Sequence, residues 1–190
     1  MTVLPLFPLH SVLFPGTTMA LHVFEARYRE LLRRCRESGE GFGVALIRTG
    51  REVGGPAVPF EVGTEATIVA VEELPGGEAN VLVEGQRRFT IRRLLPGRPY
   101  PEGEVEWLLE EAGDAESWRR TVLDLLAATG PVELGPAARD PVDLSYRLAD
   151  LLAADPGEKQ ALLEAPSAAE RLQREALLLL RTQRPQLGAG

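Results

Sequence analysis

The sequence has 190 residues, of which 44% are hydrophobic and 26% are charged. This composition is typical of a globular protein and argues against a disordered or collagen-like chain. The formal net charge is −7, and because an acidic chain repels phosphate groups, nucleic acid is disfavoured as a partner.

The first 112 residues carry mainly strand and turn signals, interrupted by one helix. Residues 4–9 are apolar, but Pro5 and Pro8 limit this segment to a sheet edge or an extended stretch. The Phe-Pro-Gly sequence at residues 14–16 predicts a turn. Apolar side chains then recur at helical spacing, which predicts a helix that ends near Gly39. The residues of this apolar stripe are Phe24, Tyr28, Leu31, Leu32 and Cys35.

Several short strands are expected after this helix. They are predicted at residues 42–47, 66–71, 80–83, 88–92 and 104–109. The segment between the first two, residues 48–60, is rich in glycine and proline and predicts a loop. The arginine pairs at residues 87–88 and 92–93 are expected to form ion pairs with acids across an exposed sheet face. Short strands with one helix predict a small, strongly bent sheet or barrel.

The hydrophobic period changes to that of helices near residues 112–114. This change predicts a first domain over residues 1–112 and a second over residues 113–190. Residues suited to cap helices begin each of four segments, at Asp114, Asp140, Asp155 and Ser167. The first of these helices is expected to stop at residues 130–131, Gly-Pro. Four helices with short links predict a small bundle.

Residues with catalytic chemistry are sparse. Lys159 is the only lysine and no GxxxxGK[ST] loop is present, which excludes a P-loop nucleotide site. His10 and His22 are the only histidines, and they lack the spacing of a metal site such as HExxH. We therefore expect no catalytic residue, no metal site and no cofactor. A small hydrolase that uses Lys159 with Ser145 or Ser167 is an alternative, although Ser167 fits better as a helix cap.

Cysteine usage and the chain ends indicate the cellular setting. Cys35 is the single cysteine, so neither an intramolecular disulfide nor a multi-cysteine zinc site can form. The N-terminus lacks a charged region followed by an apolar run, so no secretory signal is expected. The apolar run at residues 176–180 is far shorter than the roughly 20 residues that span a bilayer. We expect a cytoplasmic protein without membrane contact.

Six segments follow one another in the order of a known family. They are LPLFPLHSVLFPG at residues 4–16, LHVFEARYRELL at 21–32, FGVALI at 42–47, VGTEATIVAVEELPGGEANVLVEGQRRFTIRRLL at 62–95, RPYPEGEVEWL at 98–108 and EKQALLEAPSAAERLQREALLLLR at 158–181. Over nearly the whole chain they resemble the N-terminal substrate-binding domain of Lon proteases. The chain departs from the family pattern at Met19 and Ala20, where a proline usually precedes the Leu-x-(Ile/Val)-Phe-Glu run.

The resemblance implies an α+β fold, in which a PUA-like bent β-sheet or pseudo-barrel with one inserted helix is followed by a C-terminal four-helix bundle. It also implies a non-catalytic module that binds unfolded or flexible polypeptide segments. Such a module would act as an adaptor or regulator in protein quality control, with a protease or chaperone as a partner. An RNA-binding PUA-like protein is the alternative function. We expect a monomer or a dimer.

Apolar contacts for such a polypeptide are expected in loops rich in proline and glycine, beside the unpaired backbone groups of a sheet edge. Phe14, Met19 and Phe60 lie in or beside such loops and are the candidate peptide-binding residues. The competing interpretation is that these three side chains close the ends of the barrel.

Overall fold

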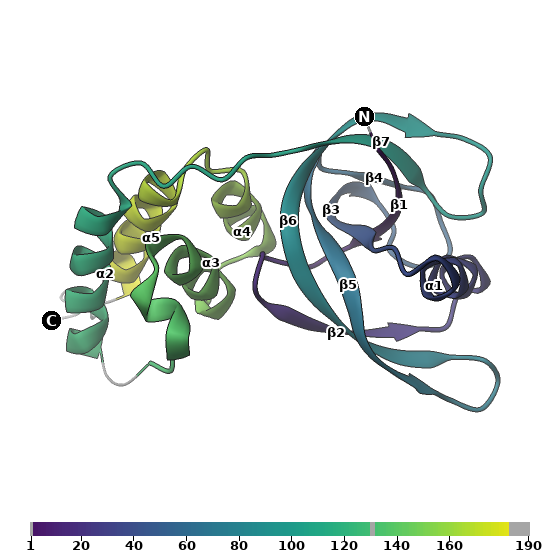
Figure 1. The fold of residues 1–190 in the computed structure, drawn as a ribbon, viewed down its shortest axis with the longest axis horizontal. Helices are drawn as coiled ribbons and strands as arrows, with labels where there is room; N and C mark the ends of the chain where they lie inside the picture. The colour runs from purple at the N-terminus through teal and green to yellow at the C-terminus, as the bar shows by residue number, and fades with distance from the viewer. Residues whose placement is uncertain (1, 130–131, 183–190) are drawn as a thin grey trace, which may run out of the picture.

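A computed structural model describes residues 2–129 and 132–182, with a strand-rich part and a helical part side by side (Figure 1). The strands are β1 (Thr2–Leu9), β2 (Thr18–Val23), β3 (Phe42–Gly50), β4 (Ala57–Pro59), β5 (Val62–Glu73), β6 (Ala79–Leu95) and β7 (Glu102–Trp107). The helices are α1 (Ala26–Ser38), α2 (Ala115–Thr129), α3 (Pro141–Leu151), α4 (Pro156–Leu163) and α5 (Ala168–Thr182), with a short 3-10 helix η1 (Gly135–Arg139). The described chain therefore has a mixed α/β fold with a largely antiparallel sheet.

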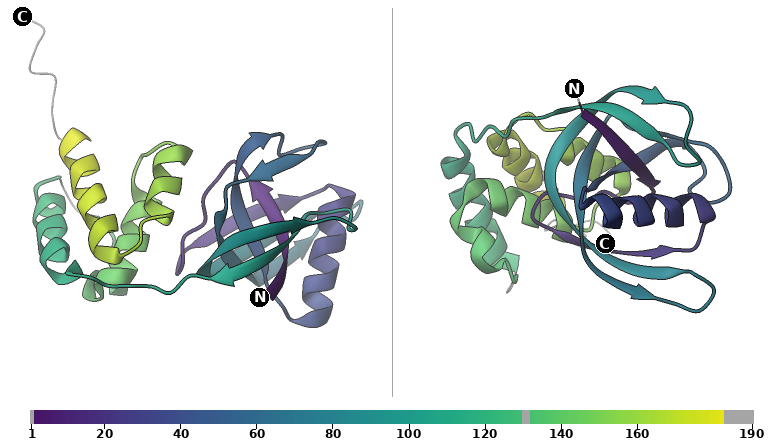
Figure 2. Two further views of the ribbon diagram at one scale, coloured as in Figure 1. Left: turned by 90° about the horizontal axis from the view of Figure 1, so that it is seen from above. Right: turned by 45° about the vertical axis from the view of Figure 1, so that its right-hand side comes forward.

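Five strands close into a ring, which gives the bent barrel that the strand pattern predicts (Figure 2). Hydrogen-bonded neighbours run in the order β1-β7-β6-β5-β3, and a parallel pairing of β1 with β3 closes the circle. The strands expected at residues 80–83 and 88–92 are one strand, β6, of 17 residues. β6 pairs with β5 along one edge and with both β2 and β7 along the other. Assignment of the ring to the PUA-like type stays a prediction.

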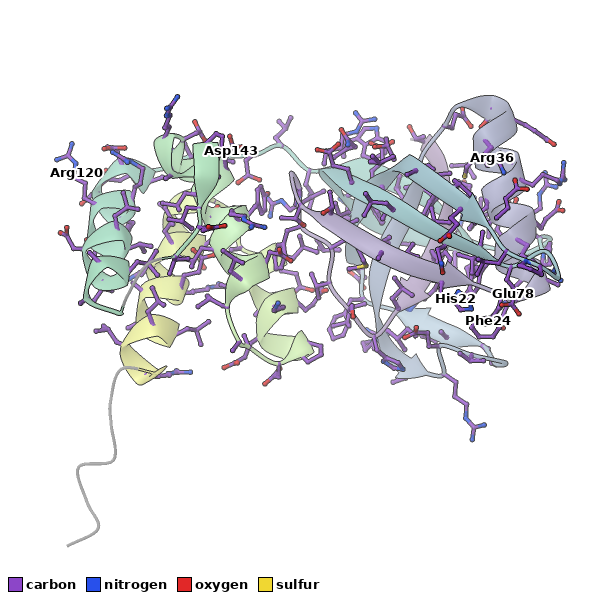
Figure 3. The ribbon with its side chains drawn as sticks, turned by 90° about the horizontal axis from the view of Figure 1, so that it is seen from below. His22, Phe24, Arg36, Glu78, Arg120 and Asp143 are labelled. Atoms are coloured by element: carbon purple, nitrogen blue, oxygen red, sulfur yellow. The ribbon has the colours of Figure 1, made fainter. Side chains whose placement is uncertain are left out.

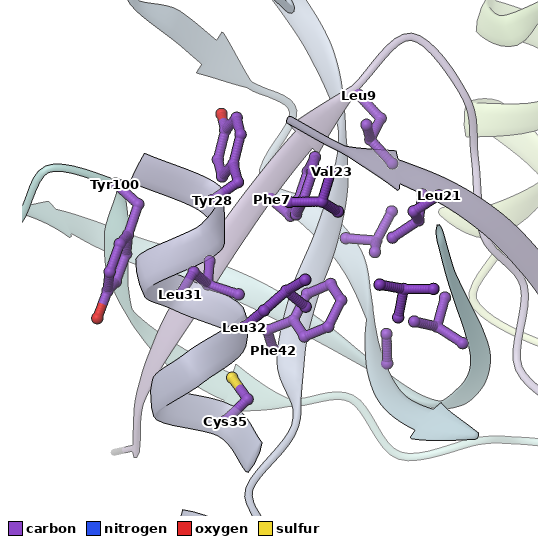
Figure 4. Close-up of a cluster of buried hydrophobic side chains, with 14 of the residues drawn as sticks. Phe7, Leu9, Leu21, Val23, Tyr28, Leu31, Leu32, Cys35, Phe42 and Tyr100 are labelled. Carbon is purple, nitrogen blue, oxygen red and sulfur yellow. The ribbon is translucent and has the colours of Figure 1, made fainter. Parts of the chain in front are cut away.

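Helix α1 packs its apolar stripe against the ring. Its buried residues are Tyr28, Leu31, Leu32 and Cys35, which join a cluster that includes Phe7 and Phe42 (Figure 4). Phe24 was expected to begin this stripe, and that expectation is wrong, because the helix starts at Ala26. Glu25 has an extended backbone, with φ −69° and ψ 136°, so Phe24 precedes the helix and stays 41% exposed.

Helix ends follow several of the predicted signals. Gly39 ends α1 with a φ of 72°, in the left-handed region that glycine adopts without strain. Asp140 accepts hydrogen bonds from two backbone N–H groups at the start of α3, and Asp155 forms a capping box at the start of α4. Ser167 accepts a backbone N–H at the start of α5. The predicted stop at residues 130–131 lies outside the described residues.

Two hydrophobic clusters organise the helical part. One is formed by residues of α2, α3 and α5. The other joins the helices to the ring, where Phe14 and Leu46 pack with Tyr146 and Leu162. Strands give way to helices between Trp107 and Ala115. The four-helix bundle and the domain division at residue 112 stay predictions.

Arg88 of β6 corrects one expectation about the arginine pairs. It was predicted on an exposed sheet face, but its side chain is only 3% exposed. Its guanidinium donates to the carbonyls of Leu163 and Ala165 at 2.8 and 2.6 Å and pairs with Glu110 at 2.8 Å. The prediction failed because the turn that follows α4 covers this part of β6. The neighbouring pairs are surface ion pairs as predicted: Arg87–Glu65, Arg92–Glu106 and Arg93–Glu104.

Candidate functional site

A groove runs along β2, between this strand, β1 and the start of α1. Its volume is about 310 Å³. Most of the side chains that line it are apolar, including Phe7, Leu9, Met19, Leu21, Val23, Phe24, Tyr28 and Val53. The groove therefore offers a largely apolar surface beside a strand.

Aromatic packing fixes one wall of the groove. Phe7 of β1 stacks on Tyr28 of α1, with ring centroids 4.0 Å apart and ring planes at 14°. The Arg27 guanidinium lies 4.5 Å from the centroid of the Tyr28 ring. Burial raises the pKa of Tyr28 to about 12, so its phenol stays neutral near neutral pH. This wall is therefore held in place by aromatic packing.

Polar side chains gather where β2 ends (Figure 3). His22 Nδ1 lies 3.0 Å from Asn80 Oδ1, and His22 Nε2 lies 3.4 Å from Glu78 Oε2. The His22 ring also stacks on Phe24, with centroids 5.8 Å apart. These contacts hold an exposed imidazole and an exposed phenyl ring at one end of the groove.

The charge on the groove is acidic. Glu25 and Glu52 line it, whereas no arginine or lysine is among its lining residues in the described part of the chain. Arg27 lies beside it, 3.1 Å from Glu25 and bonded to the carbonyls of Glu52 and Gly55. The Glu52 carboxylate accepts the backbone N–H of His10 at 2.8 Å. A ligand with cationic groups is favoured by this arrangement.

One edge of β2 is bonded to β6. The Gly85 N–H donates to the Thr17 carbonyl at 2.9 Å, and the antiparallel register continues from Thr18 opposite Glu84. In antiparallel pairs, successive residues turn their backbone groups alternately toward and away from the partner strand. The β2 residues that face β6 with N–H and C=O are Met19, Leu21 and Val23. Their side chains point into the ring.

The other edge of β2 is open. Thr18, Ala20 and His22 direct their backbone N–H and C=O groups away from β6, and all three residues are exposed. Within residues 2–129 and 132–182, β2 pairs with no strand besides β6. The structure thus places an unpaired strand edge along an apolar groove.

A second hollow of about 390 Å³ continues the groove toward the helical part, and Ser11 and Met19 line both. Asp150 and Lys159 stand on its far side, where Lys159 Nζ donates to the Asp150 carbonyl at 2.7 Å. β2 has six residues, and an extended strand of that length spans roughly 20 Å. The two hollows together follow the whole of β2.

A larger hollow of about 520 Å³ lies between α1 and the turn that joins β5 to β6. Its charged groups are bonded to one another, with Arg36 2.8 Å from Glu73 and Arg33 2.7 Å from Glu37. Arg29 donates to the Gly76 carbonyl at 3.1 Å. This hollow is bordered by mutual ion pairs, so the groove along β2 is the better candidate for a binding site.

The structure separates the three candidate peptide-binding residues. Met19 is half-buried and lies in the groove. Phe60 is also half-buried but packs against the cluster that joins ring and helices, away from the groove. Phe14 is fully buried in that cluster, 6.4 Å from the Tyr146 ring, which contradicts the exposure expected of it. The turn signal at Phe14 predicted a surface loop, but the helical part covers this loop.

Sequence reasoning missed the other groove residues. Phe7, Tyr28 and Glu52 come from three distant segments, and only the closure of the ring brings them together. The sequence holds one local signal near the groove. Pro5 and Pro8 lack a backbone N–H, which restricts the strand pairing of β1 along one edge.

The residues of the alternative functions have structural partners. Ser145 donates to the Val142 carbonyl at 2.7 Å and accepts from Arg171 at 2.6 Å. Ser167 caps α5, and Lys159 is bonded to a backbone carbonyl. The surface arginines of β6, whose charge could otherwise meet RNA phosphates, are paired with acids, as described above. Neither the hydrolase nor the RNA-binding alternative gains support from these contacts.

The described residues contain no group of three or more His, Cys, Asp or Glu side chains that is placed to hold a metal ion. A helix with the length and hydropathy of a membrane span is likewise absent from the described ranges.

Known proteins share this chain's sequence pattern and fold. The family model of the ATP-dependent protease La (LON) substrate-binding domain matches residues 3–181. The Lon protease of Roseiflexus castenholzii is 31% identical over 202 residues, an alignment that covers 99% of this chain and 25% of that protein. This chain therefore spans about a quarter of the length of such relatives.

Two solved structures support the fold. The Lon N-terminal domain protein from Xanthomonas campestris is 31% identical with a TM-score of 0.72, covering 97% of this chain and all of that one. The N-terminal domain of the Mycobacterium avium complex Lon protease, 21% identical, superimposes with a TM-score of 0.73 over 94% of this chain and 98% of that one. Since the family model covers almost every described residue, the chain belongs to the family of the substrate-binding domain of ATP-dependent protease La (Lon).

Proposed function

We propose that this chain is a non-catalytic module that binds unfolded or flexible polypeptide segments in the groove along β2. It acts as an adaptor or regulator in protein quality control, beside a protease or a chaperone. A cytoplasmic location and a monomeric or dimeric state are parts of the same proposal. Membership of a substrate-binding family supports the class of ligand.

The observation that carries the proposal is the juxtaposition of an apolar groove with an open strand edge. Unfolded chains expose apolar side chains and unpaired backbone groups together, and a site for them must satisfy both. Met19 and Phe24, which are partly exposed, supply apolar surface, and the outward edge of β2 supplies backbone donors and acceptors.

Fluorescence anisotropy with a labelled, reduced and unfolded polypeptide tests the proposal. We expect saturable binding, and Met19→Ala to weaken it about fivefold, because truncation of an interface anchor typically costs more than about 1 kcal/mol. Leu109→Ala is the matched control, since Leu109 is 86% exposed and does not line the groove. The absence of binding by the wild-type protein at tens of micromolar contradicts the proposal.

Phe60→Ala tests whether the polypeptide binds outside the groove. A loss of binding in Phe60→Ala with none in Met19→Ala would relocate the site to the loop that precedes β5, away from the groove. Circular dichroism of each variant shows whether the fold is retained.

A further inference from the structure

We propose, building on the binding function above, that the groove takes its ligand by strand addition: an extended segment with alternating apolar and basic residues pairs antiparallel with the open edge of β2. The ligand is thus a polypeptide stretch in β conformation, recognised through its backbone. Its apolar side chains enter the groove and its basic side chains meet the acidic rim.

The backbone geometry of β2 carries the first step. Thr18, Ala20 and His22 each present one N–H and one C=O on the edge away from β6. An unpaired row of this kind is a template for another strand, and proteins that do not use it usually blunt it with proline, lysine or a bulge. The open residues of β2 include none of proline, lysine or arginine. The β-bulge-like contact at Gly16, Thr17 and Gly85 lies before the open stretch.

The facing strand is blunted in this way. The Leu6 N–H of β1 donates to the Pro101 carbonyl at 2.8 Å, on the side of β7. Pro8 lies two residues after Leu6, so its backbone faces the same edge of β1. Because proline lacks an N–H, β1 has no donor at this position beside the groove. β1 therefore offers few donors to a strand in the groove, and β2 is the strand that a ligand pairs with.

Side-chain alternation defines the apolar half of the ligand. A strand added to β2 places every second side chain on the same face as Met19, Leu21 and Val23, above the groove. These positions of the ligand face the apolar lining of the groove, where Met19, Phe24 and Val53 are the more exposed side chains, and they are expected to be apolar. If the ligand shifted by one residue, its apolar side chains would turn away from the groove, so the alternation also fixes the register of the ligand against β2.

Charge complementarity defines the basic half. The charged residues that line the groove are Glu25 and Glu52, whereas its continuation toward the helices is lined by one acid and one base, Asp150 and Lys159. Arg27 offsets part of Glu25, but the Glu52 carboxylate receives only a backbone N–H among its described hydrogen bonds. Lysine or arginine at the outward positions of the ligand therefore matches the rim better than glutamate does.

Backbone N-methylation of the ligand tests strand addition without altering the protein. The probe is a labelled peptide as long as β2 with alternating leucine and lysine, measured by anisotropy against the full chain. Two methylated versions carry equal numbers of methyl groups, on the lysine or on the leucine nitrogens. In the antiparallel arrangement the lysine residues pair with Thr18, Ala20 and His22, so lysine methylation should weaken binding about tenfold or more, since each removed hydrogen bond contributes modestly.

The leucine-methylated peptide should bind within about threefold of the parent. The reverse pattern would overturn the antiparallel arrangement, because in a parallel pair the leucine nitrogens face β2. Equal affinity of both methylated peptides and the parent would overturn strand addition while leaving the binding function intact. If neither this peptide nor the unfolded polypeptide binds, the binding function itself fails.

Substitution of Ala20 gives the matching evidence from the protein. Ala20→Pro removes one outward N–H, whereas Leu109→Ala alters an exposed side chain that does not line the groove. We expect Ala20→Pro to weaken the peptide several-fold and Leu109→Ala to leave its affinity unchanged, in variants whose thermal unfolding matches the wild type. Replacing the lysines of the peptide by glutamate should weaken binding at least about tenfold at low salt, with the difference shrinking as salt is added. Equal binding of the glutamate peptide would overturn the basic preference.

Discussion

Arg88 of β6 and Arg171 of α5 approach one carboxylate from the two parts of the chain. Arg88 Nη2 lies 2.8 Å from Glu110 Oε2, and Arg171 Nη2 lies 3.2 Å from Glu110 Oε1. The Tyr146 hydroxyl donates to the same carboxylate. Arg171 is fully buried, with its guanidinium 3.9 Å from the Tyr146 ring centroid. The strand-rich and helical parts are therefore joined by a buried polar network as well as by apolar packing.

Arg88→Met is expected to lower the free energy of unfolding by about 3 kcal/mol, because removing one partner of a buried pair leaves the other groups unsatisfied. The carbonyls of Leu163 and Ala165 would lose their donor together with the carboxylate. Urea denaturation followed by tryptophan fluorescence measures the change.

Arg92→Met is the control for this experiment. Arg92 and Glu106 form an ion pair on the sheet surface, with side chains 55% and 46% exposed. Such pairs contribute about 0–1 kcal/mol, so the loss should be small. Equal losses in the two variants would contradict a structural role for the junction at Glu110.

Glu175 of α5 predicts the pH dependence of stability. Its side chain is fully buried, neither carboxylate oxygen has a hydrogen-bond partner among the described residues, and burial raises its pKa well above the ordinary value. A carboxyl with a raised pKa is protonated in the folded state over a range where the unfolded state has lost its proton. Its favourable contribution is therefore complete below the unfolded pKa and is lost as the pH rises through the folded pKa.

Glu175→Gln removes this titration. The wild type should lose stability between mildly acidic and mildly alkaline pH, and the variant should lose less over the same range. Urea midpoints measured across the range for both proteins make the comparison. Parallel pH profiles would show that Glu175 does not titrate in a buried state.

Local signals predicted the elements whose geometry is itself local. The cap at Asp140 depends on its two following N–H groups, and the stop at Gly39 depends on one backbone conformation, so both were predictable from a few residues. The surface pairs Arg92–Glu106 and Arg93–Glu104 were predictable because arginines and acids alternate with apolar residues on two strands that are close in the sequence. These features need no knowledge of the rest of the fold.

Burial by distant segments was not predictable in this way. Arg88 was expected on an exposed sheet face, but the turn after α4 covers it. Glu175 is likewise enclosed by the packing of the helices, which no local signal marks. The open edge of β2 depends on which strands complete the ring, and Met19 was proposed only from its loop context. The groove is a product of long-range pairing, which no sequence window contains.

Cys35 should be inert in the folded protein. It is buried on α1, and burial raises the pKa of its thiol to about 11. Because the thiolate is the reactive form, its fraction near neutral pH falls about a hundredfold relative to a free thiol. We expect a chromogenic disulfide reagent to react with the native chain at least that much more slowly than with the chain in urea. Similar rates in both conditions would contradict the burial of this thiol.

Gly43 of β3 sets how closely the Phe89 ring packs inside the barrel. A methyl group at Gly43 would lie 2.6 Å from Phe89 Cζ and 2.8 Å from Leu6 Cδ2, closer than non-bonded carbons can approach. Gly43→Ala should therefore lower the free energy of unfolding by about 1–3 kcal/mol through overpacking. Gly55→Ala is the control. The methyl group added at Gly55 would lie 3.6 Å from its nearest neighbour, Arg51 Cβ, which is an ordinary contact, so the stability of this variant should be nearly unchanged.

A double-mutant cycle separates this contact from other effects of the added methyl group. Phe89→Leu alone should destabilise the barrel, since Phe89 is fully buried. If the Gly43 methyl acts by colliding with the ring, the double variant should lose less stability than the sum of the two single losses. Strict additivity in urea denaturation would instead place the strain elsewhere, in the close approach to Leu6 or in the β3 backbone.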